Sequence, residues 1–157
     1  MIADGTRSSR LFRAPVRNRG DVPSMEVGPM HPFRAAIDKG DIDALPALLA
    51  EDVTFLSPVA FAPYEGRPLV SAILRAVTRV FTDFRYVGEI GEGRDHALIF
   101  KARVGDREVH GCDFLHLNDD GLIDEFCVMV RPLSGAKALS EAMAVEFESV
   151  KRELGLA

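Results

Sequence analysis

Four strand-like segments follow one another in the second half of the chain, with only short turns between them. Their bounds are 84–90, 97–104, 107–117 and 122–130. The turn signals between them are Gly91-Glu92-Gly93, Gly105-Asp106 and Asn118-Asp119-Asp120-Gly121. Connections this short cannot carry the chain back for parallel pairing, so each strand is expected to pair antiparallel with the next. The chain is therefore restricted to folds that contain a continuous antiparallel sheet.

Apolar residues at helical spacing lie before and after these strands. The clearest stripe is formed by Leu69, Val70, Ile73, Ala76, Val77, Val80 and Phe81. An earlier helix is expected to end at Gly40, and a second, capped by Asp41 or Asp43, near Ala50. A short strand over 53–55 and a loop reaching Pro68 come next. A final helix is predicted by Leu139, Met143, Phe147, Val150 and Leu154. Helices gathered first and strands gathered last predict an α+β fold, with helices on one face of a curved antiparallel sheet.

Charge divides the chain into two parts. Five arginines and three acids give residues 1–30 a charge of +2, which leaves −7 for residues 31–157 out of a total of −5. We interpret residues 1–30 as a flexible basic arm. The alternatives are a transit peptide, a gene-model extension upstream of a start at Met25 or Met30, and an arm that docks on nucleic acid or anionic lipid. Residues 31–157 are expected to form one domain. The acidic balance of this domain argues against a nucleic-acid partner.

Composition excludes several other classes of protein. Hydrophobic residues make up 47% and charged residues 27%, a mixture typical of globular chains rather than disordered ones. No apolar run approaches the ~20 residues of a membrane span, so no membrane partner is expected. Two cysteines are too few for a secreted disulfide framework. These features together predict a cytoplasmic protein.

The last predicted hairpin can be paired on the assumption that Asp119-Asp120 forms its tip. Asp113 then lies opposite Phe126, Leu115 opposite Asp124, and Cys112 opposite Cys127. One face of this hairpin is apolar apart from Asp113 and Asp124. The other face is mixed and includes His110 with Met129, Phe114 with Glu125, and His116 with Ile123. A bulge at Gly121 would shift this register by one residue.

Asp113 is the residue that this periodicity singles out. A carboxylate on an apolar face is costly unless it is partnered or protonated. One interpretation is structural: a hydrogen bond to backbone or arginine, or exposure at a cavity mouth. The other is a tuned acid or base in a pocket. Asp124 lies nearer the hairpin tip, where we expect solvent to be its partner.

No metal or cofactor site is predicted. His110 and His116 share a strand face but lie ~20 Å apart at strand rise, too far to bind one ion. The glycines around Glu92 precede a strand rather than a helix, so they do not form a phosphate-binding loop. Cys112 and Cys127 could form a cross-strand disulfide or remain thiols, as a cytosolic chain would keep them.

Several short motifs, in this order, resemble the nuclear transport factor 2-like superfamily, which includes SnoaL-like cyclases and ketosteroid isomerases. The matching pieces are Phe33…Asp38-Lys39-Gly40-Asp41, Ala50-Glu51-Asp52-Val53, Ser57-Pro58…Glu65-Gly66-Arg67, Asp113-Phe114…Asp119-Asp120-Gly121-Leu122-Ile123 and Val128-Met129-Val130-Arg131-Pro132-Leu133. The resemblance implies a cone-shaped curved antiparallel sheet wrapped by the N-terminal helices, with a C-terminal helix. It also implies a homodimer through the outer sheet face.

The resemblance to ketosteroid isomerases can be tested residue by residue. At the position of that family's general base this chain has Ser57, which cannot abstract a proton near pH 7. At the position of the oxyanion tyrosine it has Phe33, which has no hydroxyl. Only the oxyanion aspartate is matched, by Asp113. Steroid isomerisation by that three-group mechanism is therefore not expected.

The same resemblance implies a pocket between the sheet and the helices that takes a small hydrophobic molecule. Its lining is expected to include Phe33, Ile37, Phe55, Leu98, Phe100, Val109, Phe126, Val128 and Val130. Catalysis as an isomerase, cyclase or hydrolase would use Asp113 as acid or base, with Tyr64 as an accessory hydrogen-bond donor. The alternative is a non-catalytic module that binds a ligand or another protein.

Overall fold

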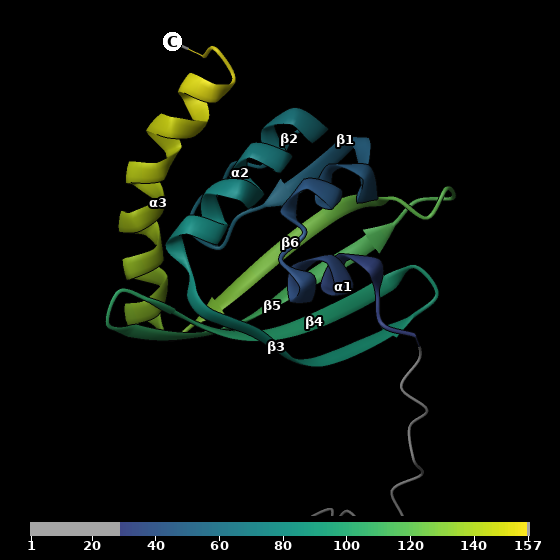
Figure 1. Cartoon of the computed structure of the whole chain (residues 1–157), viewed down its shortest axis with the longest axis horizontal. Helices are drawn as coiled ribbons and strands as arrows, with labels where there is room; N and C mark the ends of the chain where they lie inside the picture. Colours follow the sequence, from purple (N-terminus) through teal and green to yellow (C-terminus); the bar gives the residue numbers. More distant parts are fainter. Residues whose placement is uncertain (1–28, 157) are drawn as a thin grey trace, which may run out of the picture.

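The computed structural model describes residues 29–156, which form a curved sheet with all the helices on one side (Figure 1). The helices are α1 (Pro32–Lys39), the short 3-10 helix η1 (Ile42–Leu48), α2 (Arg67–Val80) and α3 (Leu133–Glu153). The strands are β1 (Leu49–Leu56), β2 (Tyr64–Glu65), β3 (Thr82–Glu92), β4 (Asp95–Val104), β5 (Arg107–Leu117) and β6 (Ile123–Arg131). The arm expected over residues 1–30 lies, apart from Pro29 and Met30, outside the described residues.

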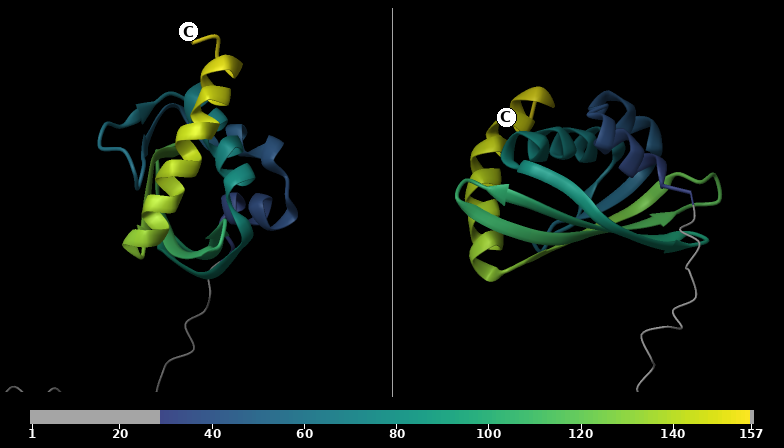
Figure 2. Two further views of the ribbon diagram at one scale, coloured as in Figure 1. Left: turned by 90° about the vertical axis from the view of Figure 1, so that its left-hand side faces the viewer. Right: turned by 60° about the horizontal axis from the view of Figure 1, so that its bottom comes forward.

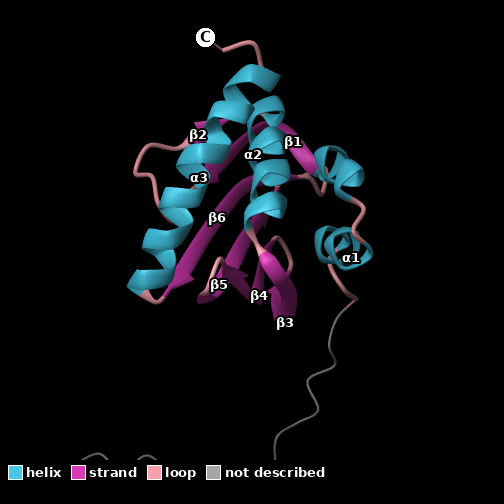
Figure 3. Cartoon of the chain, turned by 60° about the vertical axis from the view of Figure 1, so that its left-hand side comes forward, coloured by secondary structure: helices cyan, strands magenta, loops and turns pink. Residues whose placement is uncertain are grey.

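The described strands form one sheet in the order β2-β1-β6-β5-β4-β3. Strands β3 to β6 pair antiparallel with their sequence neighbours, which confirms that expectation. Strand β1 instead runs parallel to β6, because the long segment between them supplies the crossover that parallel pairing requires. Figures 2 and 3 show the sheet curling beneath α1, α2 and α3 without closing. The predicted α+β architecture is confirmed, with this one parallel pair.

The first helices differ in how their ends are fixed. Helix α1 begins where the His31 ring accepts a hydrogen bond from the Phe33 backbone N–H, and it ends at Gly40 in the left-handed conformation, with φ 71°. The helix expected to reach Ala50 is the short η1, and its Asp41 cap makes no side-chain hydrogen bond. Strand β1 begins at Leu49, earlier than predicted. Leu49 is fully buried there, so packing of the strand ends the helix.

The predicted register of the β5–β6 hairpin is wrong by two residues. Asp113 pairs with Val128 and Cys112 with Met129, while Cys127 pairs with Phe114. The shift arises near the tip, where Leu117 pairs with Ile123 but His116 pairs with Glu125. Asp124 is thus an extra residue, a bulge of the kind that bends and twists a strand. A shift of two residues preserves the faces, so the apolar face still holds Asp113.

The bulge does change the residues beside it. Ile123, expected on the outer face, is fully buried and also pairs with Leu49 of β1. Asp124, expected to be solvated, is half-buried, and its Oδ1 makes no hydrogen bond within the described part of the chain. The hairpin tip is instead held by Asn118, whose side-chain oxygen accepts hydrogen bonds from the backbone N–H groups of Asp120 and Leu122.

The core lies between the concave face of the sheet and the helices. Its largest fully buried side chains are Phe33, Phe100, Phe126, Leu45, Leu49, Leu98, Leu115, Ile123, Val53, Val70 and Val150. The ring of Phe126 lies edge-on to Phe33 at 5.1 Å and near Phe55 at 5.6 Å, so aromatic packing joins α1, β1 and β6. Among the described residues, no helix is long and apolar enough to cross a membrane.

Candidate functional site

A cavity of about 690 Å³ lies between the sheet and the helices. The aromatic residues that line it are Phe33, Phe55, Tyr64, Phe81, Phe84, Tyr86, Phe100, Phe126 and Phe147. The polar residues that line it are Asp38, Ser57, Thr78, Arg85, Asp113, Ser140, Glu148 and Lys151. A cavity of this size, lined mainly by apolar residues with a smaller set of polar ones, is typical of sites for small organic molecules.

Asp113 is the buried acid of this wall. It lies on β5, and 6% of its surface is exposed. The Tyr86 hydroxyl donates a hydrogen bond of 2.6 Å to its Oδ2. Burial raises the pKa of Asp113 from 3.8 to about 7, and the hydrogen bond from Tyr86 offsets part of that rise. The carboxyl group therefore changes protonation near neutral pH.

Strand register places Tyr86 beside Asp113. Tyr86 pairs with Phe100, and Phe100 pairs with Gly111, two residues before Asp113 on the same face. Gly111 leaves room there for the Phe100 ring: an added Cβ would lie 2.3 Å from Phe100 Cζ. The Phe84 ring meets Tyr86 edge-on at 5.0 Å and stacks on Phe100 at the same distance. Packing of these rings fixes the direction of the Tyr86 hydroxyl.

The pKa of Tyr86 is raised well above its usual value, first by burial and then by the negative potential of Asp113. The phenol therefore keeps its proton and serves as a permanent donor to Asp113. The Arg34 guanidinium lies 6.0 Å from the centre of the Tyr86 ring and opposes this rise.

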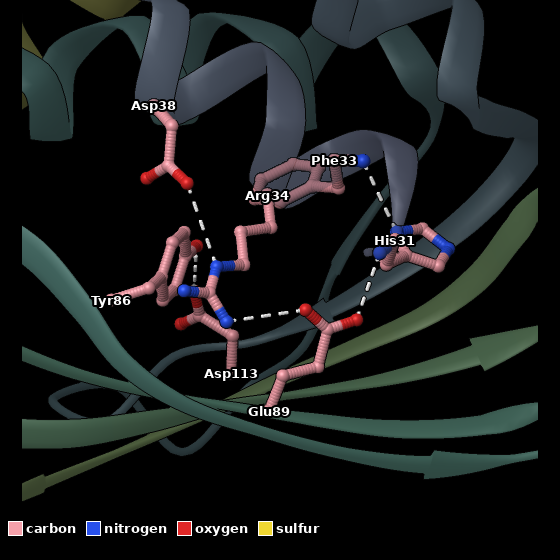
Figure 4. A network of polar contacts seen from close by, with 7 residues as sticks. All are labelled: His31, Phe33, Arg34, Asp38, Tyr86, Glu89 and Asp113. Carbon is pink, nitrogen blue, oxygen red and sulfur yellow. Dashed lines mark hydrogen bonds and ion pairs between the residues drawn. The ribbon is translucent and has the colours of Figure 1, made fainter. Parts of the chain in front are cut away.

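Arg34 belongs to a polar network that ties α1 to β3 (Figure 4). Its Nη1 lies 3.3 Å from Glu89 Oε2, and its Nε lies 3.5 Å from Asp38 Oδ2. The other Glu89 oxygen accepts a hydrogen bond of 2.8 Å from the His31 backbone N–H. Burial is the main cause that lowers the pKa of His31. The network holds α1 over the end of β3 and keeps Arg34 above Tyr86.

Six of the predicted pocket residues line the cavity, together with Asp113 and Tyr64: Phe33, Ile37, Phe55, Phe100, Phe126 and Val128. Three others do not line it: Leu98, Val109 and Val130. Leu98 is fully enclosed in the core beside Asp113. Val109 is covered by the first turn of α3. The two elements are so close that a Cβ added at Gly135 would lie only 2.7 Å from Val109 Cγ1. Helix α3 therefore covers the part of the sheet around Val109, which was predicted to line the pocket.

Tyr64 lies on the cavity wall but not in the polar network around Asp113. Its ring packs between Phe147 at 5.5 Å and Phe55 at 6.4 Å. The tyrosine that contacts Asp113 is Tyr86, which sequence reasoning missed. Its signal was its place two residues after Phe84 in a predicted strand, since residues two apart share a face.

Ser57 also lies on the cavity wall. Its Oγ accepts a hydrogen bond of 3.1 Å from the Val59 backbone N–H, so it holds the loop after β1. Within residues 29–156, no group of three or more histidine, cysteine or acidic side chains could hold a metal ion. Cys112 and Cys127, on the opposite face of the sheet, are free thiols.

Comparison with known proteins fits this architecture. The sequence model of the SnoaL-like domain matches residues 31–126. The chain belongs to the SnoaL-like family. The described elements from α1 to β5 and the first part of β6 fall within the matched range, and Asp113 and Tyr86 are both inside it. The resemblance to this superfamily is therefore confirmed.

Two solved structures are similar to this SnoaL-like chain in sequence as well as in fold. One is an uncharacterized protein with a cystatin-like fold from Silicibacter pomeroyi DSS-3, with 40% identity and a TM-score of 0.75 over 81% of this chain and 93% of the other. The other is a steroid delta-isomerase from Pseudomonas aeruginosa, with 45% identity and a TM-score of 0.71 over 74% of this chain and 87% of the other.

A third structure shares the fold alone. It is the epoxide hydrolase/cyclase-like enzyme SalBIII, with 20% identity and a TM-score of 0.54 over 66% of this chain and 87% of the other. No curated protein matches the sequence. The SnoaL-like fold thus has both isomerase and cyclase-like structural neighbours.

Proposed function

We propose that this SnoaL-like protein binds a small apolar molecule in the cavity and that Asp113 transfers a proton to or from it. The observation that carries the proposal is one buried carboxyl group on an aromatic wall, with one oxygen held by Tyr86 and a pKa near 7. An acid or base works best when its pKa lies near the operating pH. A purely structural carboxylate would not need to face the cavity.

The geometry divides the two oxygens of Asp113 between two tasks. Oδ2 accepts the Tyr86 hydrogen bond, while Oδ1 makes no hydrogen bond to another described residue and is the oxygen free to meet a ligand. When Asp113 is protonated, it can donate a proton to a ligand oxygen, and the Tyr86 hydroxyl then stabilises the carboxylate that remains. When Asp113 is ionised, it can accept a proton from the ligand.

The reaction class is an isomerisation, cyclisation or hydrolysis of an apolar substrate. The likeness to the Pseudomonas aeruginosa steroid delta-isomerase supports proton transfer on such a molecule. Ser57 and Phe33 do not supply the base and phenol of the ketosteroid isomerases, so the chemistry centres on Asp113. For a step that needs a second carboxylate, Asp38 lies on the same wall, paired with Arg34. Two carboxyl groups in different environments can divide acid and base roles.

Ligand capture tests the binding part of the proposal. The purified protein is expected to retain a small apolar molecule that denaturing mass spectrometry detects. Ala144, exposed on α3, lines the cavity, while its neighbour Val145 is 74% exposed and does not. Ala144→Trp is expected to reduce the retained molecule at least tenfold, because the indole narrows the cavity rim. Val145→Trp serves as the matched control and should leave retention unchanged.

The outcomes of that experiment separate two functions. Equal retention by both tryptophan variants, or no retention by the natural chain and no binding of added apolar probes, would contradict the binding proposal. If both the natural chain and Asp113→Asn bind the molecule and neither converts it chemically, the result would favour the non-catalytic binding module. Conversion by the natural chain alone supports catalysis by Asp113.

Replacement of Tyr86 tests the coupling of the pair. Because the Tyr86 hydrogen bond lowers the pKa of Asp113, Tyr86→Phe is expected to raise that pKa above about 7. The measurement is a carbon-13 NMR titration of the Asp113 carboxyl carbon. Tyr64→Phe is the control, since the Tyr64 ring packs between Phe55 and Phe147, and it should leave the titration unchanged. If the pKa of Asp113 falls in the Tyr86→Phe variant, the hydrogen bond from Tyr86 does not favour the carboxylate form of Asp113.

We also propose that the protein is a homodimer through the outer face of the sheet. The support is the set of large apolar side chains exposed there on β3, β5 and β6: Ile90, Phe114 and Met129. Apolar patches of this kind on a folded chain are typical of interaction surfaces.

A further inference from the structure

The loop between β1 and β2 is apolar although it lies at the surface. Its sequence is Ser57-Pro58-Val59-Ala60-Phe61-Ala62-Pro63, with no charged side chain in a chain that is 27% charged. Phe61 is fully exposed (105%), more than any other large apolar side chain of residues 29–156. A single exposed apolar residue is ordinary, but surface loops are usually polar. An exposed loop that is apolar along its whole length indicates a surface for apolar contact.

The same loop forms part of the cavity wall. Residues 57–60 line the cavity, and so do Phe55 and Tyr64, which pair with each other at the base of the loop. The Tyr64 ring lies 5.5 Å from the Phe147 ring of α3, so the base of the loop contacts that helix. Figures 2 and 3 show the loop beside α3. Phe61 is thus the first residue of the loop beyond the cavity wall.

Helix α3 also brings the cavity wall to the surface. Ser140, Ala144 and Glu148 line the cavity, and all three are exposed. Each is four residues from the next, so they lie along one face of the helix. These residues therefore form a rim of the cavity at the surface, on the helix that the base of the loop contacts.

Few hydrogen bonds hold the loop in place. Within residues 29–156, the segment 58–63 makes one, which the Val59 backbone N–H donates to Ser57 Oγ at 3.1 Å. The ends of the loop are fixed by the pairing of β1 with β2. A segment with fixed ends and few hydrogen bonds can change conformation at little cost to the rest of the fold.

Phe61 lies between two alanines. Small residues in loops commonly absorb the dihedral changes of a hinge, and Ala60 and Ala62 are suited to that task. Ala60 lines the cavity, and the Cα atom of Phe61 follows that of Ala60 by ~3.8 Å along the chain. A local rotation of the backbone is therefore enough to turn the Phe61 ring towards the rim.

We infer that the β1–β2 loop is a lid, and that Phe61 turns inward to complete the cavity wall around a bound apolar molecule. Closure is favoured because it removes apolar surface of both the ring and the bound molecule from water. The inference rests on the proposed function in one respect, that the cavity binds an apolar molecule. It would stand if Asp113 were not catalytic.

Tryptophan fluorescence tests closure directly, because the natural chain contains no tryptophan. Phe61→Trp places one at the tip of the loop, where the natural ring is fully exposed and the fold does not depend on it. The probe is dicyclohexyl ketone, an apolar molecule with one oxygen that Asp113 can meet. With the probe bound, the emission maximum is expected to shift by about 10 nm to shorter wavelength, and the iodide quenching constant to fall about threefold, because closure removes the indole from water.

Val145→Trp is the matched control for this measurement. Val145 is 74% exposed on α3 and does not line the cavity. The emission and the quenching of that variant should be the same with and without the probe.

Isothermal titration calorimetry measures the contribution of the lid to affinity. Phe61→Ser is expected to bind dicyclohexyl ketone at least fivefold more weakly than the natural chain, because the closed lid loses the ring that contacts the probe. Its urea unfolding midpoint should be unchanged, since the ring is fully exposed. Val145→Ser should bind the ketone like the natural chain.

The outcomes separate the lid from the proposed function. If the ketone binds but the indole of Phe61→Trp stays exposed, or if Phe61→Ser binds it as tightly as the natural chain, the lid is overturned and the proposed function stands. If the natural chain does not bind the ketone, the lid and the binding part of the proposed function both fail. An emission shift with phosphatidylcholine vesicles and none with the ketone would assign the loop to a membrane surface and would overturn the lid.

Discussion

Asp113→Asn is expected to be more stable than the natural chain at pH 8 and about as stable at pH 4. The reason is the raised pKa of Asp113, about 7 in the folded protein against 3.8 in the unfolded chain. Below about pH 4 both states hold the proton, and the folded state carries no penalty. Between pH 4 and 7 the unfolded chain releases the proton while the folded chain keeps it, so stability falls as pH rises. Well above pH 7 both states have released the proton, and the free energy of unfolding falls no further.

The size of that loss follows from the pKa difference. At 1.36 kcal/mol for each pKa unit, a rise of about three units corresponds to roughly 4 kcal/mol. Asparagine has nearly the shape of aspartate but cannot ionise, so the free energy of unfolding of the variant does not fall in this way. Its amide oxygen can still accept the Tyr86 hydrogen bond. Urea unfolding at pH 4, 6 and 8 measures the difference between the two proteins.

The matched control for this experiment is Asp106→Asn, because the Asp106 side chain is 89% exposed in a turn. Its unfolding free energy should follow that of the natural chain at every pH. If the stability of Asp113→Asn shows the same pH dependence as that of the natural chain, the raised pKa of Asp113 is contradicted.

Gly111→Ala is expected to destabilise the protein by about 3 kcal/mol. A Cβ there would lie 2.3 Å from Phe100 Cζ and 2.7 Å from the Met129 backbone oxygen. The ring would have to leave its place against Tyr86, and the backbone oxygen belongs to a paired strand. The same substitution should therefore also disturb the hydrogen bond between Tyr86 and Asp113. Urea unfolding measures the first effect, and the Asp113 titration measures the second.

Gly88→Ala, in the neighbouring part of the same sheet, is the control for this substitution. Its Cβ would meet only the Ile99 side chain, most closely the flexible Cδ1 end at 3.2 Å. We expect a cost below about 1 kcal/mol, because that side chain can move by a few tenths of an ångström. Equal costs for the two variants would show that Gly111 is not the close contact on which the position of Tyr86 depends.

Local sequence patterns predict much of the fold. The apolar stripe from Leu69 to Phe81 predicts α2, and the turn signals around Gly93, Gly105 and Gly121 separate β3 to β6 as expected. The hairpin register was wrong because Asp124 bulges, and nothing in its identity distinguishes a bulged residue from a paired one. The parallel pairing of β1 with β6 is non-local, so periodicity within either strand carries no signal of it.

The candidate site was predictable in part. Asp113 stood out because alternation placed a carboxyl group among apolar residues, and a shift of two residues did not change its face. Tyr86 was missed because its contact with Asp113 spans three strands and depends on the space left at Gly111. Tyr64 is the polar aromatic residue of a predicted loop, yet its ring packs between Phe55 and Phe147. Contacts across several strands require the register, which local sequence does not determine.

The most direct test of the account is the protonation of Asp113 itself. A carbon-13 NMR titration of the Asp113 carboxyl carbon in the natural chain measures its pKa without knowledge of the ligand. We predict a midpoint near 7, because burial in the cavity raises the pKa of Asp113 and the Tyr86 hydrogen bond offsets only part of that rise. A midpoint near 4, the ordinary value of an aspartate in water, would contradict it.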